Sequence, residues 1–279
     1  MNLLRAWLDQ AWDEHAEHPR RVLEGLRERA PSLPDDGDGA EAVRLAEHVA
    51  LAHLADTTAL DTLLAALPAQ GALQPAVARA RWALATLAGS APPEVPDRAR
   101  WAALHGVVMT LVARGRGAEA RRRLLADEAA AATHADMPSR QAYAATANNS
   151  ALDLRLGARG DPARDALMVD AALLARRAWS ACGGWIHVER ADYQLAMCHA
   201  AAGQGAQAVA AGEACLAACE ANAADAAERF FAHECLVHAR RAAGDAGGAA
   251  REREQMAALL AQVDDAAMRS WCEKTLAET

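Results

Sequence analysis

The sequence predicts an all-α protein: a right-handed superhelix (α-solenoid) of antiparallel helix pairs with long repeats of about 41–45 residues. Alanine, the strongest helix former, supplies more than a quarter of the 279 residues, whereas Phe and Tyr number two each. Four similar glycine turns recur at intervals of 45, 43 and 41 residues, as expected of a stacked helical repeat. They begin at Gly115, Gly160, Gly203 and Gly244.

Helical periodicity and end signals predict the individual elements. Asn2 is suited to cap a first helix, and Pro19 is suited to open a second. Asp161 followed by Pro162 is a further start signal. The remaining helices are expected at residues 40–55, 57–69, 72–88, 97–114, 117–134, 139–157, 162–181, 185–202, 205–221, 225–243, 246–262 and 265–277.

The strongest internal boundary is the proline-rich stretch of residues 89–97, because three prolines within five residues forbid a continuous helix. We therefore expect two regions. Residues 1–96 form an N-terminal region of degenerate helix pairs, and residues 97–279 form the regular repeat region.

Composition and charge narrow the classes of function that the protein could have. The formal net charge of −8 disfavours a general nucleic-acid binder, which needs a concentrated basic surface. No apolar run is long enough to span a membrane, and Arg5 and Asp9 interrupt any signal-peptide core. The six cysteines lie within helical patterns, which suits buried reduced thiols. We expect a cytoplasmic protein with neither nucleic acid nor membrane as a partner.

One unit of the repeat region, residues 185–221, resembles a tetratricopeptide repeat at its packing positions. The matching positions are Leu195-Ala196, His199, the turn glycine Gly203, Ala208 and Cys215-Leu216. The other units keep fewer of these residues, and the intervals of 41–45 residues exceed the usual 34 of that family. The resemblance covers about two-thirds of the chain and implies architecture rather than a particular partner.

In that family the first helix of each pair lines a concave groove that holds an extended peptide or a partner helix. The resemblance therefore implies a non-catalytic interaction module, with Asn149 where related arrays hold a peptide backbone or a terminal carboxylate. The groove positions are His105, Asn148, Asn149, Arg190, Tyr193, Gln194, Glu234, His238 and Arg241.

Two other functions remain open. A small-molecule sensor or carrier would enclose its ligand between aromatic walls, which are Trp179, Trp185, Phe230 and Phe231. A metal-binding protein would use Cys215, Cys219 and His187, although Cys215 also fits a packing position. Arg190 and its neighbours on the same helix are equally suited to clamp a ligand carboxylate or to form interhelical hydrogen bonds.

Catalysis has no recognisable motif, so no catalytic residue and no cofactor is predicted. His15, His18, His48 and His53 are interpreted as isolated packing or capping residues. The apolar stripe that carries Trp7 and Trp12 is a place where a homodimer could form, or a terminal cap of the array.

Overall fold

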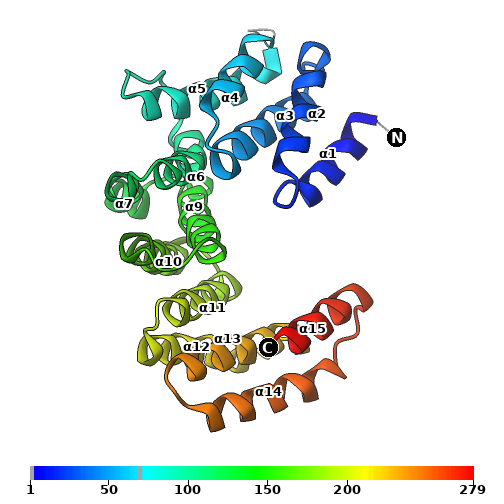
Figure 1. The fold of residues 1–279 in the computed structure, drawn as a ribbon, viewed down its shortest axis with the longest axis vertical. Coiled ribbons are helices and arrows are strands. Elements are labelled where there is room, and N and C mark those ends of the chain that lie inside the picture. Colours follow the sequence, from blue (N-terminus) through cyan, green and yellow to red (C-terminus); the bar gives the residue numbers. More distant parts are fainter. Residues whose placement is uncertain (1–2, 68–70) are drawn as a thin grey trace. The chain divides into compact units, whose positions relative to one another are not determined.

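The computed structural model describes residues 3–67 and 71–279, and these residues form helices and turns with no strand (Figure 1). The prediction of an all-α protein is confirmed. None of the described helices combines the length and apolar character needed to cross a membrane. The predicted cap at Asn2 lies outside the described residues, and the helix predicted at 57–69 ends at Ala65.

Contacts divide the chain into two compact units, Met1–Ala129 and Ala130–Thr279, which we call the first and second units. The boundary predicted at residues 96/97 is one between two kinds of helical repeat. Contacts between residues do not test such a boundary, so it stays a prediction. The helix that follows it packs on the preceding helix within the first unit.

The first unit contains α1 to α7 and three short helices of other types. Its core is built on large side chains that are fully buried, among them Leu45, Leu51 and Trp101. The α-helices are α1 (Leu3–Glu14), α2 (Pro19–Arg29), α3 (Gly37–His48), α4 (Thr57–Ala65), α5 (Gln74–Ala88), α6 (Asp97–Ala113) and α7 (Gly117–Leu125). The short helices are the 3-10 helices η1 (Ala30–Ser32) and η3 (Gly71–Leu73) and the π-helix η2 (Val49–His53).

Two predicted helices of this region differ from the structure. The helix expected at 40–55 changes at Val49 into the π-helix η2, against which α6 packs. The helix expected at 117–134 breaks after Leu125 and resumes as α8 (Glu128–Thr133). At the break, the Asp127 carboxylate accepts a hydrogen bond of 2.9 Å from the indole nitrogen of buried Trp101, so a tertiary contact opens the helical turn.

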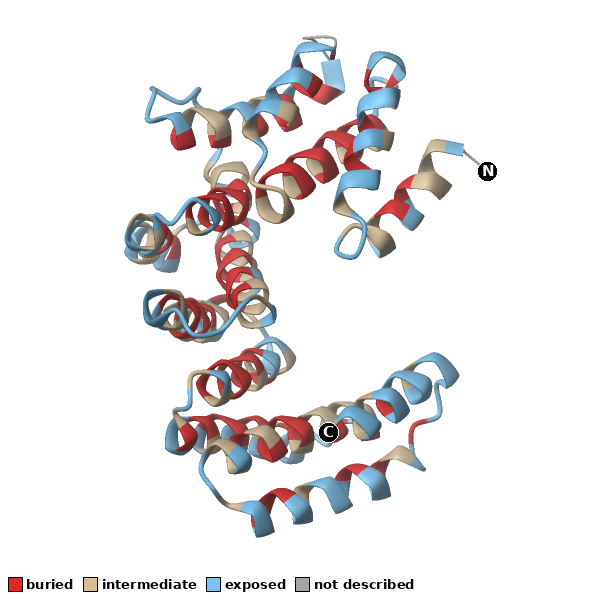
Figure 2. Cartoon of the chain, viewed as in Figure 1, coloured by how far each residue is buried: buried red, intermediate tan, exposed pale blue. Residues whose placement is uncertain are grey.

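The second unit consists of helices that pack on their sequence neighbours. α9 packs on α10, α11 on α12, and α13 on α14, and Figure 2 shows buried residues on the facing sides of these helices. The side chain of Asp161 caps α10 through the amides of Ala163 and Arg164, as predicted. The elements are α9 (Met137–Leu156), α10 (Pro162–Cys182), α11 (Trp185–Ala201), α12 (Gly205–Ala221), α13 (Ala226–Ala242), α14 (Ala246–Leu260) and α15 (Ala266–Glu278).

The glycine turns fall between helices as predicted. All four turn glycines have φ between +71° and +96°, a region that residues with a Cβ rarely occupy. In each of the turns at Gly203 and Gly244, the residue after the glycine donates its amide to a carbonyl of the preceding helix. At Gly203 and Gly244 the repeating signature is therefore a helix-ending turn.

Candidate functional site

The predicted groove residues of the second unit come from α9, α11 and α13, which neighbour one another. α11 contacts both α9 and α13. Asn148 is half-buried and Asn149 is exposed on α9, and neither amide side chain hydrogen-bonds to another described residue. Gln194 is buried on α11. His105 belongs to the first unit, where it is buried and stacks on His48.

Four polar residues of these three helices form a cluster, which we call the polar cluster: Arg155 on α9, Tyr193 on α11, and Glu234 and His238 on α13. The Tyr193 hydroxyl donates to Glu234 Oε2 at 3.0 Å. His238 Nε2 lies 3.9 Å from Glu234 Oε1. The structure thus brings together three of the predicted residues and adds Arg155, which the sequence interpretation missed.

The position of Arg155 in the sequence could have indicated its place beside the predicted groove residues. It lies seven residues after Asn148, which places both on one face of α9. Its Nε atom is buried and has no hydrogen-bond partner among the described residues. Its positive charge opposes the rise that burial causes in the pKa of Tyr193, and it adds to the fall that burial causes in the pKa of His238. Arg155 is therefore a cation whose hydrogen-bonding capacity the described residues leave unfilled.

Burial governs protonation in the polar cluster. It raises the pKa of Glu234, against the opposing effects of the Tyr193 hydrogen bond and the Arg155 charge. It also raises the pKa of Tyr193 well above its ordinary value, so the phenol stays a donor. The pKa of His238 is lowered by burial first, and then by the charges of Arg241 and Arg155. His238 is consequently a neutral imidazole at neutral pH.

Arg190 and Arg241 act as links between helices. Arg190 of α11 forms an ion pair with Glu228 of α13. Arg241 donates to the carbonyl oxygen of Thr279, which follows α15. The sequence left two roles open for Arg190: to bind a ligand carboxylate or to form an interhelical contact. The structure contains the interhelical contact.

The cysteines proposed as weak metal ligands lie in the core between α11, α12 and α13. Cys215 and Cys219 are fully buried, and the Cys215 thiol donates to Glu189 Oε1 at 2.9 Å. The hydrogen bond with Cys219 lowers the pKa of Cys215, but its hydrogen bond with Cys235, burial and the nearby Glu189 raise it overall. The pKa of Cys219 is raised by its hydrogen bond with Cys215, by burial and by Glu189, whereas metals bind the thiolate. His187 is exposed elsewhere on α11 and stacks on Trp179 at 4.6 Å between ring centroids. Cys215 and Cys219 therefore pack as small apolar residues.

Glu189 is the most perturbed carboxyl in this core. Burial raises its pKa to about 7, against the opposing hydrogen bond from Cys215. Its Oε2 atom is buried without a hydrogen-bond partner among the described residues. A protonated carboxyl satisfies this setting better than a charged one.

The four aromatic residues suggested as walls of a small-molecule pocket do not all share one environment. Phe230 is fully buried in the hydrophobic core formed with Val237 and Met256. Phe231 packs against this core, with its ring centroid 5.4 Å from that of Phe230 and 5.0 Å from that of Trp271. Trp185 is 40% exposed at the start of α11.

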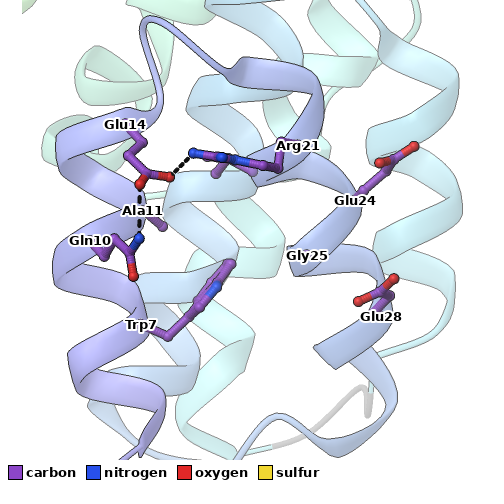
Figure 3. Close-up of a pocket in the computed structure, with 9 residues that line it drawn as sticks. Trp7, Gln10, Ala11, Glu14, Arg21, Glu24, Gly25 and Glu28 are labelled. Atoms are coloured by element: carbon purple, nitrogen blue, oxygen red, sulfur yellow. Dashed lines mark hydrogen bonds and ion pairs between the residues drawn. The ribbon is translucent and has the colours of Figure 1, made fainter.

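A cavity that the sequence did not predict lies between α1 and α2 of the first unit (Figure 3). It encloses about 370 Å³, and Trp7 lies beside Gly25 in it. A Cβ at Gly25 would approach Trp7 Cζ2 to 2.8 Å, so the glycine admits the indole ring. Glu14 is already bound by Gln10 and Arg21. The Trp7 stripe therefore packs partly against α2 within the chain.

The interpretation of His15, His48 and His53 as isolated residues is wrong. One ligating nitrogen from each lies within 4.8 Å of the other two. In an α-helix, residues five apart point about 140° away from each other, so the pattern of His48 and His53 gave no signal. The π-helix at Val49–His53 changes this angle and brings the two rings together.

A scan against protein families finds no match to this chain, and a search of curated proteins finds no relative.

Proposed function

We propose that the second unit is a non-catalytic interaction module that binds an extended peptide or helix of another protein on the layer formed by α9, α11 and α13. The polar cluster carries this proposal: α11 and α13 place a phenol, a carboxyl and an imidazole close together, and α9 supplies a cation whose charge acts on all three. The free amides of Asn148 and Asn149 lie on α9, which also supplies Arg155.

The packing of the helices supports a curved, solenoid-like stack. α9 contacts α11 and α11 contacts α13, whereas the alternate helices α10, α12 and α14 share no comparable contact within the described part of the unit. Helices that approach more closely on one side make a stack curve toward that side. The layer of α9, α11 and α13 would then be concave, as in tetratricopeptide arrays.

The chemistry of this layer suits a peptide that carries a carboxylate. Asparagine amides both donate and accept hydrogen bonds, so they can pair with a peptide backbone. The guanidinium of half-buried Arg155 can bind a carboxylate through a charge-assisted bond. We assign the backbone contacts to Asn148 and Asn149 and the carboxylate contact to Arg155. Arg190 is assigned instead to helix packing, because Glu228 already binds it.

The cysteines support a reducing compartment. All six are free and buried. This agrees with the cytoplasmic location that we propose, where thiols stay reduced.

The experiment that tests this function is selection from a random peptide library on the full-length chain, followed by fluorescence anisotropy with the selected peptides. Asn149→Ala should weaken binding by about 3- to 10-fold, the value of one or two neutral hydrogen bonds. The matched control is Gln207→Ala, an exposed amide on α12. Circular dichroism should show unchanged helicity in both variants.

Two results would contradict the proposal. One is a library that yields no specific peptide. The other is a set of selected peptides whose affinity falls equally with Gln207→Ala and Asn149→Ala, because binding would then not distinguish the two layers of helices.

A further inference from the structure

Three histidines of the first unit form a compact triangle. The ring centroids of His15 and His48 are 4.9 Å apart, those of His15 and His53 5.0 Å, and those of His48 and His53 4.9 Å. All three side chains are partly buried. The three residues come from different places in the fold: the turn after α1, the last residue of α3, and the last residue of η2.

We propose that His15, His48 and His53 form a binding site for a divalent transition-metal ion of the Zn²⁺ class, independent of the peptide-binding function. Within the described chain, these are the residues whose ligand atoms gather closely enough to hold a metal. Neutral imidazole is a preferred ligand of zinc, copper and nickel. Three protein ligands leave one tetrahedral position for water or for a donor from another molecule.

The nitrogen positions match this geometry. His48 Nε2 and His53 Nε2 lie 3.1 Å apart. Two nitrogens bound to Zn²⁺ at 2.0–2.1 Å in a tetrahedral arrangement are about 3.3–3.4 Å apart. A proton shared between the two nitrogens holds them together, and the ion would replace it. The ligand nitrogen of His15 lies within 4.8 Å of the other two, and metal binding would draw it closer to them.

The protein also fixes the orientation of His15. Its Nδ1 atom lies 2.5 Å from the carbonyl oxygen of Trp12. A carbonyl only accepts hydrogen bonds, so Nδ1 carries the proton and Nε2 presents its lone pair. Metal-binding histidines use this arrangement, in which the second nitrogen donates to a backbone carbonyl or a carboxylate.

Neighbouring residues fix the backbone that carries His53. Thr110 of α6 donates its hydroxyl to the carbonyl oxygen of Leu51, within η2, at 2.8 Å. A Cβ at Gly106 would meet Leu51 Cβ at 2.9 Å, so the glycine permits the close approach of α6. Just after η2, Ala55 adopts φ +51°, which is unusual for a residue other than glycine. π-Helical turns and unusual backbone angles concentrate at functional sites.

The rings around the triangle hold His15 and His48 in place. Trp12 packs edge-on against His15, with centroids 5.2 Å apart, and His105 stacks on His48 at 5.5 Å. The Trp12 indole donates to Glu41 Oε1 at 2.9 Å, which fixes its own ring. The three histidines are thus preorganised by contacts that a metal ion would not have to create.

The test is isothermal titration of the full chain with Zn²⁺, after removal of bound metal by a chelator, with visible absorption of Co²⁺ as a second probe. The wild type should bind one equivalent with an affinity in the micromolar range or tighter. His15→Ala and His53→Ala should each weaken Zn²⁺ binding by at least about 100-fold, because each removes a ligand. The matched control is His18→Ala, an exposed histidine three residues from His15, which should bind as the wild type does.

Thermal melting of the metal-free protein, with and without added Zn²⁺, separates metal binding from folding. Zn²⁺ should raise the melting temperature of the wild type and of His18→Ala, but not that of the triad variants. If His53→Ala fails to fold, His15→Gln, at the turn after α1, gives the same comparison. No stoichiometric Zn²⁺ binding by the wild type would overturn the proposal. Equal Zn²⁺ affinity of the wild type and a folded His15 or His53 variant would also overturn it.

Discussion

Tyr193 of α11 donates its hydroxyl to Glu234 of α13 across 3.0 Å, which joins two helices of the proposed binding layer. Glu234 is 8% exposed, so water cannot easily replace this donor. Tyr193→Phe should therefore lower stability by about 1–3 kcal/mol. The melting temperature should fall by about 2–4 °C for each kcal/mol.

A double-mutant cycle with Glu234→Met, which has no acceptor oxygen, separates the hydrogen bond from the loss of packing. If the effects of Tyr193→Phe and Glu234→Met on stability simply add, the two residues are not coupled and the description of this contact is wrong.

Glu189 makes the stability of the protein depend on pH. Its pKa is about 7 in the folded protein and 4.5 for the unperturbed group, so the folded state binds more protons between these values. The free energy of unfolding should then decrease as pH rises from about 4.5 to about 7, by roughly 2 kcal/mol. Glu189→Gln cannot ionise and should escape this loss.

The measurement is the melting temperature of both proteins at pH 5 and pH 8. The two should melt nearly alike at pH 5, and the wild type should melt about 4–8 °C below the Glu189→Gln variant at pH 8. Parallel curves for the two proteins would show that Glu189 is not the group responsible.

Substitution of Gly244 tests the structural role of the glycine turns. Its φ is +77°, and a Cβ there would have nothing within 4 Å, so Gly244→Ala introduces backbone strain without a clash. We expect a loss of about 1 kcal/mol or more. Gly247, inside α14, has only ordinary contacts for a Cβ. Gly247→Ala should instead add up to about 1 kcal/mol, because alanine favours the helix.

Thermal melting of the Gly244→Ala and Gly247→Ala variants gives the two signs directly. Similar shifts in the same direction would mean that the conformation of the turn is not what the glycine provides.

Substitution of Asp127 tests the contribution of its hydrogen bond at the break between α7 and α8. It accepts from buried Trp101 and forms an ion pair of 3.0 Å with Arg100. Asp127→Ala leaves the indole N–H without this acceptor and should cost about 1–3 kcal/mol. Asp127→Asn keeps an acceptor oxygen and should cost less. Equal losses of melting temperature in the two variants would argue against the role of the indole hydrogen bond.

Most of the fold was predictable because its signals are local. Glycine turns, the Asp161-Pro162 start and alanine-rich periodicity each act within a few residues, and they located the helices of the second unit to within about two residues. The break at Asp127 was not predictable in this way. It depends on Trp101, 26 residues earlier, and the sequence between them gives no pairing signal.

The candidate sites were less predictable for the same reason. The resemblance to tetratricopeptide repeats selected Tyr193, Glu234 and His238, which the structure places together. It did not indicate that Arg190 would be bound by Glu228, 38 residues away, because the register between helices is set by packing. The histidine triangle was missed because a π-helix changes which residues share a face.

The most direct test of the proposed binding layer is photo-crosslinking with a selected peptide that carries a benzophenone group, followed by mass spectrometry of the crosslinked residues. We predict crosslinks to α9, α11 and α13, with weaker crosslinking at a fixed peptide concentration in Asn149→Ala and unchanged crosslinking in Gln207→Ala. Crosslinks confined to α10, α12 and α14 would contradict the account.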